Sequence, residues 1–270
     1  MTGNKERMVR LIVTVCKALV FLIVWAVLAS VIPIPSVEPP AVWRFWAEWI
    51  PFACIAAVTL LFYLAERRRI AVHILPLSIS TIVKSCLLGL AWIGAATGVL
   101  LAVGAVRIGQ RHTVTLLWLW IVSAFVNTVM QELLVRGYVY QMIRKTYHTA
   151  AAAVVTTALF TLAHGGALEA GVIPTLNIVV MSLFMTALLE DTGTLAAPIC
   201  VHFLWNSVGG IVLGGVSLAD DYPHVFDVAF SGNPLLSGGS CKIEGSIVVL
   251  LLNMVCTFGI VAWNKRCLRT

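Results

Sequence analysis

The sequence predicts an all-α fold, a polytopic bundle of about eight transmembrane helices. Hydrophobic residues make up 60% of the 270 residues, and the mean hydropathy is +0.97. Charged residues account for 11% of the chain, whereas soluble domains carry about 25%. Apolar runs close to the roughly 20 residues of a membrane-spanning helix recur along the sequence. We therefore expect a single membrane domain over residues 1–270.

Eight apolar segments are candidates for these helices. They cover residues 11–32, 50–65, 85–106, 113–143, 149–164, 173–189, 194–216 and 245–263. The first run is longer than the core of a signal peptide, which has about 7–15 residues, so we interpret it as a retained helix. Three tryptophans in VWRFWAEW (42–49) are typical of a membrane interface. The polar, Gly- and Pro-bearing segment 217–243 is predicted to be an outward-facing loop.

Basic residues near four of these segments predict the orientation. They are Lys5, Arg7, Arg10, Arg67, Arg68, Arg69, Arg144, Lys145, Lys265, Arg266 and Arg269. With an even number of helices they fall on one side, and such residues are enriched in cytoplasmic loops; Arg107 and Arg111 are exceptions. We expect a multi-pass protein of a bacterial plasma membrane with both termini in the cytoplasm. The loops also explain the net charge of +6, so we expect lipid contacts and no nucleic-acid partner.

The segment VMQELLVRGYVYQ (129–141) places charged side chains inside an apolar helix. A charge at the centre of a membrane helix costs about 2.5–3.5 kcal/mol on insertion scales. Glu132 and Arg136 are four residues apart, so they share a helix face and can form an ion pair. Taken alone, this pattern is also explained by an ion pair that only packs the helix.

Two further segments carry polar residues on other predicted helices. FTLAH ends in His164, and HFLWN places His202 and Asn206 one turn apart. Counted from the expected cytoplasmic ends, Glu132 and these three residues lie about 15–25 Å deep. We therefore predict that they share a polar cavity that is open to water on one side.

These residue types suit the hydrolysis of an amide. A carboxylate beside a neutral imidazole can activate water as a general base. His202 and Asn206 can donate hydrogen bonds to a developing oxyanion, and Arg136 can hold Glu132 ionised. The chain has no HExxH motif, and it places no Ser or Cys nucleophile beside a base on a recognisable motif.

At these residues the chain resembles the CAAX prenyl protease type II and bacteriocin-processing family, also called ABI or CPBP. QELLVRG, FTLAH and HFLWN are similar to the family motifs EExxxR, FxxxH and HxxxN/D, in the same order. The resemblance covers roughly residues 113–216, and residues 1–106 are expected to form accessory helices. It implies a bundle of about eight helices around a polar cavity. It also implies endopeptidase activity without a covalent intermediate.

The chain departs from the family pattern at Gln131, where the family has its first glutamate. The resemblance implies that this glutamate is the base that works with His164, while Glu132 pairs with Arg136. Glutamine cannot accept a proton at neutral pH, and consecutive helix residues point about 100° apart. Three hypotheses follow. Glu132 acts as the base after a small rotation, the protein is an inactive relative that binds peptides, or glutamine replaces a native glutamate.

The sequence therefore predicts an intramembrane endopeptidase that cleaves a membrane-associated CAAX-like or bacteriocin-like substrate. In this prediction His164 and Glu132 activate water, and His202 and Asn206 form the oxyanion site. A peptide-binding immunity or regulatory protein is the main alternative. A proton-coupled transporter is a further alternative, but no internal symmetry is visible. We expect no cofactor. A divalent metal held by Glu132, His164 and His202 is the alternative that the family suggests, although no closed ligand set is visible.

Overall fold

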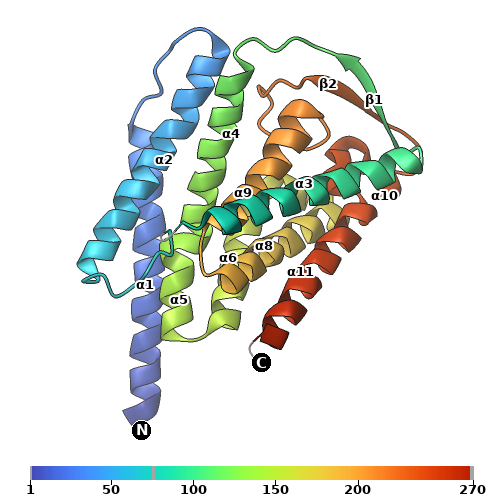
Figure 1. Cartoon of the computed structure of the whole chain (residues 1–270). Helices are drawn as coiled ribbons and strands as arrows, with labels where there is room; N and C mark the ends of the chain where they lie inside the picture. The colour runs from blue at the N-terminus through green and yellow to red at the C-terminus, as the bar shows by residue number, and fades with distance from the viewer. Residues whose placement is uncertain (1, 75–76, 268–270) are drawn as a thin grey trace.

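Helices form at all eight predicted apolar segments in the computed structural model, which describes residues 2–74 and 77–267. The bounds are α1 Thr2–Val31, α2 Pro40–Ala65, α3 Ile79–Ala102, α4 Leu117–Glu132, η1 Leu133–Gly137, α5 Tyr138–Thr146, α6 Thr149–Ala163, α7 Gly165–Ala170, α8 Val172–Thr192, α9 Ala196–Leu204, η2 Trp205–Val212 and α11 Ile247–Cys267. The polytopic all-α bundle is thus confirmed (Figure 1). Arg269, counted above among the basic residues, lies outside the described part.

The number of membrane spans differs from the prediction. Over the described residues, six helical stretches are long and apolar enough to cross a membrane. Thr149–Ala163 and Ala196–Val212 are apolar but shorter, so the count of eight is not confirmed. The chain is a multi-pass membrane protein.

The second helix begins ten residues before the predicted start. α2 opens with Pro40 in its first turn, where a missing N–H costs nothing because the first N–H groups of a helix lack helical partners. The tryptophan-rich stretch 42–49 is therefore part of the helix itself. This extension brings Glu48 into the bundle, where it is 6% exposed.

Two helices of the motif region contain π-helical turns. α4 continues through η1 into α5 as one rod, Leu117–Thr146. α9 continues into η2. A π turn locally changes the helical register and is frequent at functional sites. Arg136 lies in η1 and Asn206 in η2, so both motifs contain this distortion.

The segment predicted to be a loop contains regular structure that the sequence prediction missed. It contains β2 Phe226–Phe230, which pairs antiparallel with β1 Val106–Arg111, a strand that lies outside this segment; Val106 is opposite Phe230. The same segment holds α10 Pro234–Ser237 and the 3-10 helix η3 Gly239–Gly245. Each strand is short, and the pairing joins residues more than 100 positions apart. No local sequence pattern therefore predicts this pairing.

Figure 1 shows both ends of the chain at one end of the bundle and the two strands at the other. The connection after α2 lies beside the end of α5, because Lys145 Nζ donates a hydrogen bond to the carbonyl oxygen of Arg69 at 2.6 Å. The basic clusters around 67–69 and 144–145 are therefore adjacent. Arg107 lies on β1, away from them.

Packing of the bundle fixes the helices that carry the motifs. α4 contacts α2 and α9, and α6 contacts α8. Trp205, next to Asn206, stacks on Trp92 of α3 with ring centroids 4.0 Å apart. Its indole N–H donates to Glu244 Oε1 at 3.3 Å. The start of η2 is thus held from two sides.

Candidate active site

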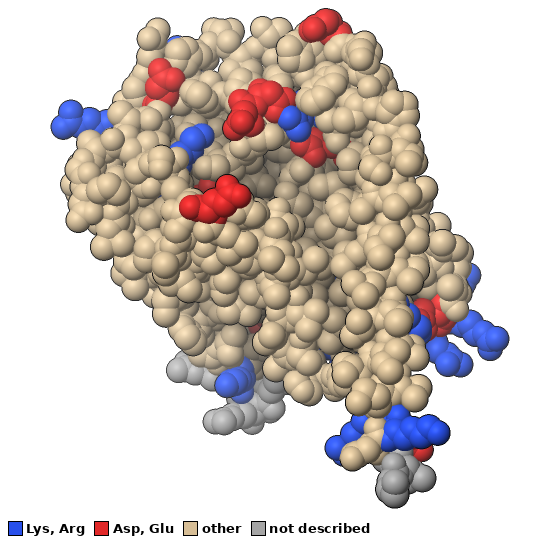
Figure 2. All heavy atoms as spheres, turned by 180° about the vertical axis from the view of Figure 1, so that it is seen from behind, with Lys and Arg blue, Asp and Glu red and all other residues tan. Residues whose placement is uncertain are grey.

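A cavity of about 710 Å³ lies between the helices of the motif region. Its wall includes Glu48, Gln131, His164, His202, Asn206 and Glu244. It also includes Ser217 to Ala219 and Ser240 to Cys241, which belong to the segment that carries β2 and η3. The cavity therefore reaches the end of the bundle that is opposite the termini. Figure 2 shows the surface hollowed on one face, with Asp and Glu side chains nearby and most Lys and Arg at the other end.

Glu132 and Arg136 form the predicted ion pair. Arg136 Nη1 donates to Glu132 Oε1 at 3.0 Å and to Oε2 at 2.9 Å. Both side chains are 0% exposed. They follow one another on one face because four residues make about one helical turn.

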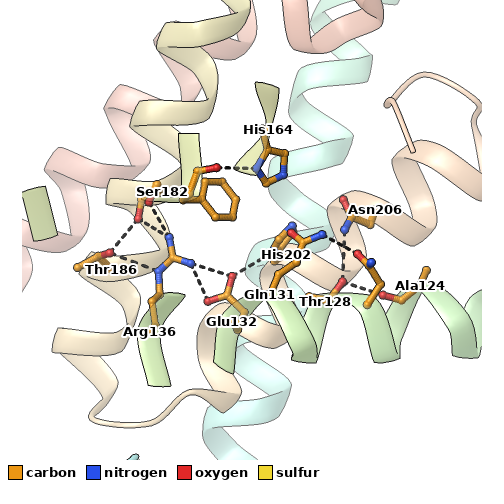
Figure 3. A network of polar contacts seen from close by, with 12 residues as sticks. Ala124, Thr128, Gln131, Glu132, Arg136, His164, Ser182, Thr186, His202 and Asn206 are labelled. Carbon is orange, nitrogen blue, oxygen red and sulfur yellow. Dashed lines mark hydrogen bonds and ion pairs between the residues drawn. The ribbon is translucent and has the colours of Figure 1, made fainter. Parts of the chain in front are cut away.

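The other side of the guanidinium is also occupied (Figure 3). Arg136 Nη2 donates to the carbonyl oxygen of Ser182 at 2.8 Å and to its Oγ at 2.9 Å, and Nε donates to Thr186 Oγ1 at 3.3 Å. The ring of Phe160 lies 5.2 Å from the guanidinium carbon, which adds a cation–π contact. The arginine thus joins the rod of α4, η1 and α5 to α8 and α6.

His202 is hydrogen-bonded to Glu132. Its Nδ1 lies 2.9 Å from Glu132 Oε1, and the side chain is 3% exposed. Because an ionised carboxylate can only accept hydrogen bonds, Nδ1 carries the proton in this contact. The remaining ring nitrogen, Nε2, is then available to the cavity that His202 lines. When the ring is protonated, Nε2 becomes a second donor.

His164 stands where α6 ends and the chain turns into α7. Its Nδ1 lies 2.8 Å from the carbonyl oxygen of Phe160, which can only accept, so Nδ1 is again the protonated nitrogen. Nε2 of the neutral ring therefore carries a lone pair. The side chain is half-buried and lines the cavity, which suits a group that takes up a proton.

Asn206 lies on η2, opposite α4. Its Nδ2 donates to Thr128 Oγ1 at 3.3 Å, and Thr128 Oγ1 donates to the carbonyl oxygen of Ala124 at 2.8 Å. An amide nitrogen has two N–H groups, so one of them remains for an occupant of the cavity.

Gln131 points to a different partner from Glu132. Its Nε2 donates to Asn127 Oδ1 at 2.6 Å, and Asn127 Nδ2 donates to Glu48 Oε2 at 2.6 Å. Sequence reasoning missed Glu48 and Asn127. Asn127 stands one turn before Gln131 on α4, so helical spacing was a signal for it. Glu48 belongs to no motif, and no pattern in the sequence pointed to it.

The structure separates the six predicted site residues into two groups. Gln131, His164, His202 and Asn206 line the cavity, whereas Glu132 and Arg136 are fully buried behind its wall. Both carboxylate oxygens of Glu132 accept hydrogen bonds. This position suits the orientation of His202 more than direct contact with water.

The same geometry bears on the metal that the family suggests. Among the residues that the structure describes, no group of three or more His, Cys, Asp or Glu side chains is placed to hold a metal ion. Glu132, one of the three predicted ligands, has its oxygens bound by Arg136 and His202. This donor set does not fit a metal ion, because the Glu132 oxygens are already hydrogen-bonded.

Fold and site together define a multi-pass helical membrane protein with a His- and Asn-lined cavity and a buried Glu–Arg pair. Residues 113–208 match the family of type II CAAX prenyl endopeptidases, Rce1-like. The match spans all three motifs and confirms the predicted family for this segment, a family of membrane proteases. Neither the curated proteins nor the solved structures contain a significant match to the chain.

Proposed function

We propose that the protein is an intramembrane endopeptidase that hydrolyses a peptide bond of a membrane-associated substrate inside this cavity. One observation carries the proposal: Gln131, His164, His202 and Asn206, drawn from three separate helical regions, line a single cavity of about 710 Å³. The partners we propose are a peptide or protein substrate and the surrounding lipid. The Rce1-like match supports the reaction class.

In the proposed reaction, His164 Nε2 takes a proton from a water molecule as the water oxygen attacks the carbonyl carbon. Asn206 Nδ2 donates to the resulting oxyanion, and His202 Nε2 does so when its ring is protonated. Glu132 stabilises that protonated ring through Nδ1. The proton on His164 then passes to the leaving amine nitrogen, so no covalent enzyme intermediate forms. Gln131 accepts or donates hydrogen bonds but transfers no proton.

A peptide-binding role without cleavage is the second candidate. It is favoured by Gln131, because the family glutamate at this position is replaced by a group that cannot act as a base. The only motif carboxylate, Glu132, is turned away from the cavity and paired with Arg136. An immunity or regulatory protein would need the cavity only to hold a peptide.

Cleavage by the purified protein separates the two candidates. A panel of internally quenched peptides, with and without a prenyl group, is incubated with the protein, and a chelator is included in a parallel sample. The parent should cleave at least one peptide, and Asn206→Ala should slow that cleavage about 10²–10³-fold because one oxyanion donor is lost. Asn4→Ala, which changes an exposed residue near the start of α1, is the control. Peptide binding without any cleavage would favour the second candidate.

The side of the membrane from which a substrate enters follows from the basic clusters. We expect both termini in the cytoplasm, because the clusters near 67–69 and 144–145 lie together at the end of the bundle where the chain begins and ends. Since the cavity reaches the opposite end, it should open on the non-cytoplasmic side. Reporter fusions at the C-terminus and insertions near Gly232 measure this directly. A C-terminus outside the cell would contradict it.

A further inference from the structure

Glu48 is a buried carboxylate in the cavity wall that no family motif contains. It lies on α2, outside the Rce1-like segment 113–208, and is 6% exposed. Arg44 Nη1 donates to its Oε1 at 3.1 Å, the Tyr222 hydroxyl donates to the same Oε1 at 3.3 Å, and Asn127 Nδ2 donates to its Oε2 at 2.6 Å. Arg44 also pairs with Asp221. Both carboxylate oxygens of Glu48 therefore accept hydrogen bonds from the surrounding side chains.

The accepting oxygens of Glu48 fix the direction of every hydrogen bond that follows. Glu48 Oε2 accepts from Asn127, so Asn127 turns its Nδ2 toward α2. Asn127 then presents Oδ1 to α4, and Gln131 must meet it with Nε2. Amide orientations are often ambiguous because oxygen and nitrogen look alike. Here the chain of contacts from Glu48 leaves one arrangement for Asn127 and one for Gln131.

This arrangement leaves Gln131 with a free acceptor. Its Oε1 is buried and has no hydrogen-bond partner among the residues that the structure describes. Buried polar atoms in proteins are nearly always paired, and exceptions mark catalytic groups or sites of bound water. Gln131 lines the cavity, so a water molecule or an N–H group of a bound peptide would supply the donor that this oxygen lacks.

We propose that Glu48 is a positioning residue of this site. Acting through Asn127, it holds the Gln131 amide so that Oε1 is offered to water or peptide in the cavity. The carboxylate that the family carries at position 131 is thus replaced by an amide whose orientation a carboxylate on α2 controls. The function of this orientation rests on the proposed peptidase or peptide-binding role, but the coupling between the three side chains does not.

A carboxylate at position 131 conflicts with the orientation of Asn127. Gln131→Glu places two carboxylates against Asn127, which presents a nitrogen to one of them and an oxygen to the other. The contact with the carbonyl oxygen is repulsive, so this single change should destabilise the protein. Adding Glu48→Gln reverses the direction of both hydrogen bonds. The amide at position 48 then donates to Asn127 Oδ1, and Asn127 Nδ2 donates to the carboxylate at position 131. Arg44 and Tyr222 keep an oxygen acceptor at position 48.

Thermal unfolding of the full-length purified protein in detergent tests the coupling. The set comprises the parent, Gln131→Glu, Glu48→Gln and the double variant. We expect Gln131→Glu to lower Tm by on the order of 5 °C and the double variant to recover most of that loss, as for side chains coupled in one network. Glu38→Gln, at an exposed loop position, is the matched control and should recover none of it. Recovery by the control, or no recovery by the double variant, would overturn the proposal.

Two further measurements complete the test. In an Asn127→Ala background the effects of the two changes should become additive, because the bridging amide is gone; persistent coupling would contradict the role of Asn127. In the cleavage assay, a carboxylate at position 131 that is correctly paired should act as a base, which raises the rate of cleavage by about 10²–10⁴-fold. The double variant should therefore exceed Gln131→Glu in kcat with little change in KM. Coupling in Tm without cleavage by any variant would support the hydrogen-bond chain and count against the peptidase.

Discussion

Arg136→Ala is expected to lower the free energy of unfolding by about 3–5 kcal/mol, the cost of removing one partner of a buried ion pair. The guanidinium is 0% exposed and donates to Glu132, Ser182 and Thr186. Its loss leaves Glu132 charged and buried with only His202 as a donor. It also removes the contact that joins the rod of α4, η1 and α5 to α8. Thermal unfolding of the purified variant measures the loss.

Arg107→Ala is the matched control for this experiment. Arg107 is an exposed residue on β1, and surface changes of this kind usually stay within about 0.5 kcal/mol. Replacing Glu132 by glutamine together with Arg136→Met should recover part of the loss, because removing both charges leaves no unpaired ion. Equal stability of the Arg136→Ala and Arg107→Ala variants would show that the pair contributes nothing to the bundle.

The second large effect is expected at His164. His164→Ala should reduce kcat for peptide cleavage by about 10²–10⁴-fold, the usual contribution of a positioned general base. KM should change little, because the proposed role of the imidazole is proton transfer and not substrate binding. The hydrogen bond from Nδ1 to the Phe160 carbonyl oxygen holds the ring at the end of α6. His164→Ala removes the lone pair on Nε2 without disturbing the Glu132–Arg136 pair.

An exposed histidine supplies the control for this prediction. His112 pairs with Asp227 at 2.8 Å near the strands, outside the cavity wall, so His112→Ala should retain the parent rate. Cleavage by the His164→Ala variant at the parent rate would contradict the proposed base. Loss of peptide binding in the same variant would instead assign His164 to substrate recognition.

Much of the fold follows from the sequence because the membrane leaves the backbone few options. An apolar segment in lipid must satisfy its own N–H and C=O groups, and a helix does so within the segment. The eight apolar runs therefore become eight helical stretches. The pairing of Glu132 with Arg136 is equally local, since residues four apart share a helix face. The motif residues His164, His202 and Asn206 could also be found from spacing alone.

The direction of each side chain was decided by the tertiary structure. Gln131 and Glu132 are neighbours in the sequence, yet one lines the cavity and the other is sealed behind it by His202 and Arg136. Consecutive helix residues point about 100° apart, so only one of the two can face the cavity. Which one does depends on how α8 and α9 pack around α4, because Ser182 and His202 hold the Glu132–Arg136 pair in place.

Contacts between distant segments were also beyond the sequence. Glu48 reaches the site because α2 packs against α4 and because Tyr222, some 170 residues later, closes over it. The strands β1 and β2 also pair across more than 100 residues. The sequence by itself determined which long apolar segments are helices and that Glu132, Arg136, His202 and Asn206 are buried. Only the tertiary structure decided which of those residues face the cavity, because that depends on packing between helices that no local pattern records.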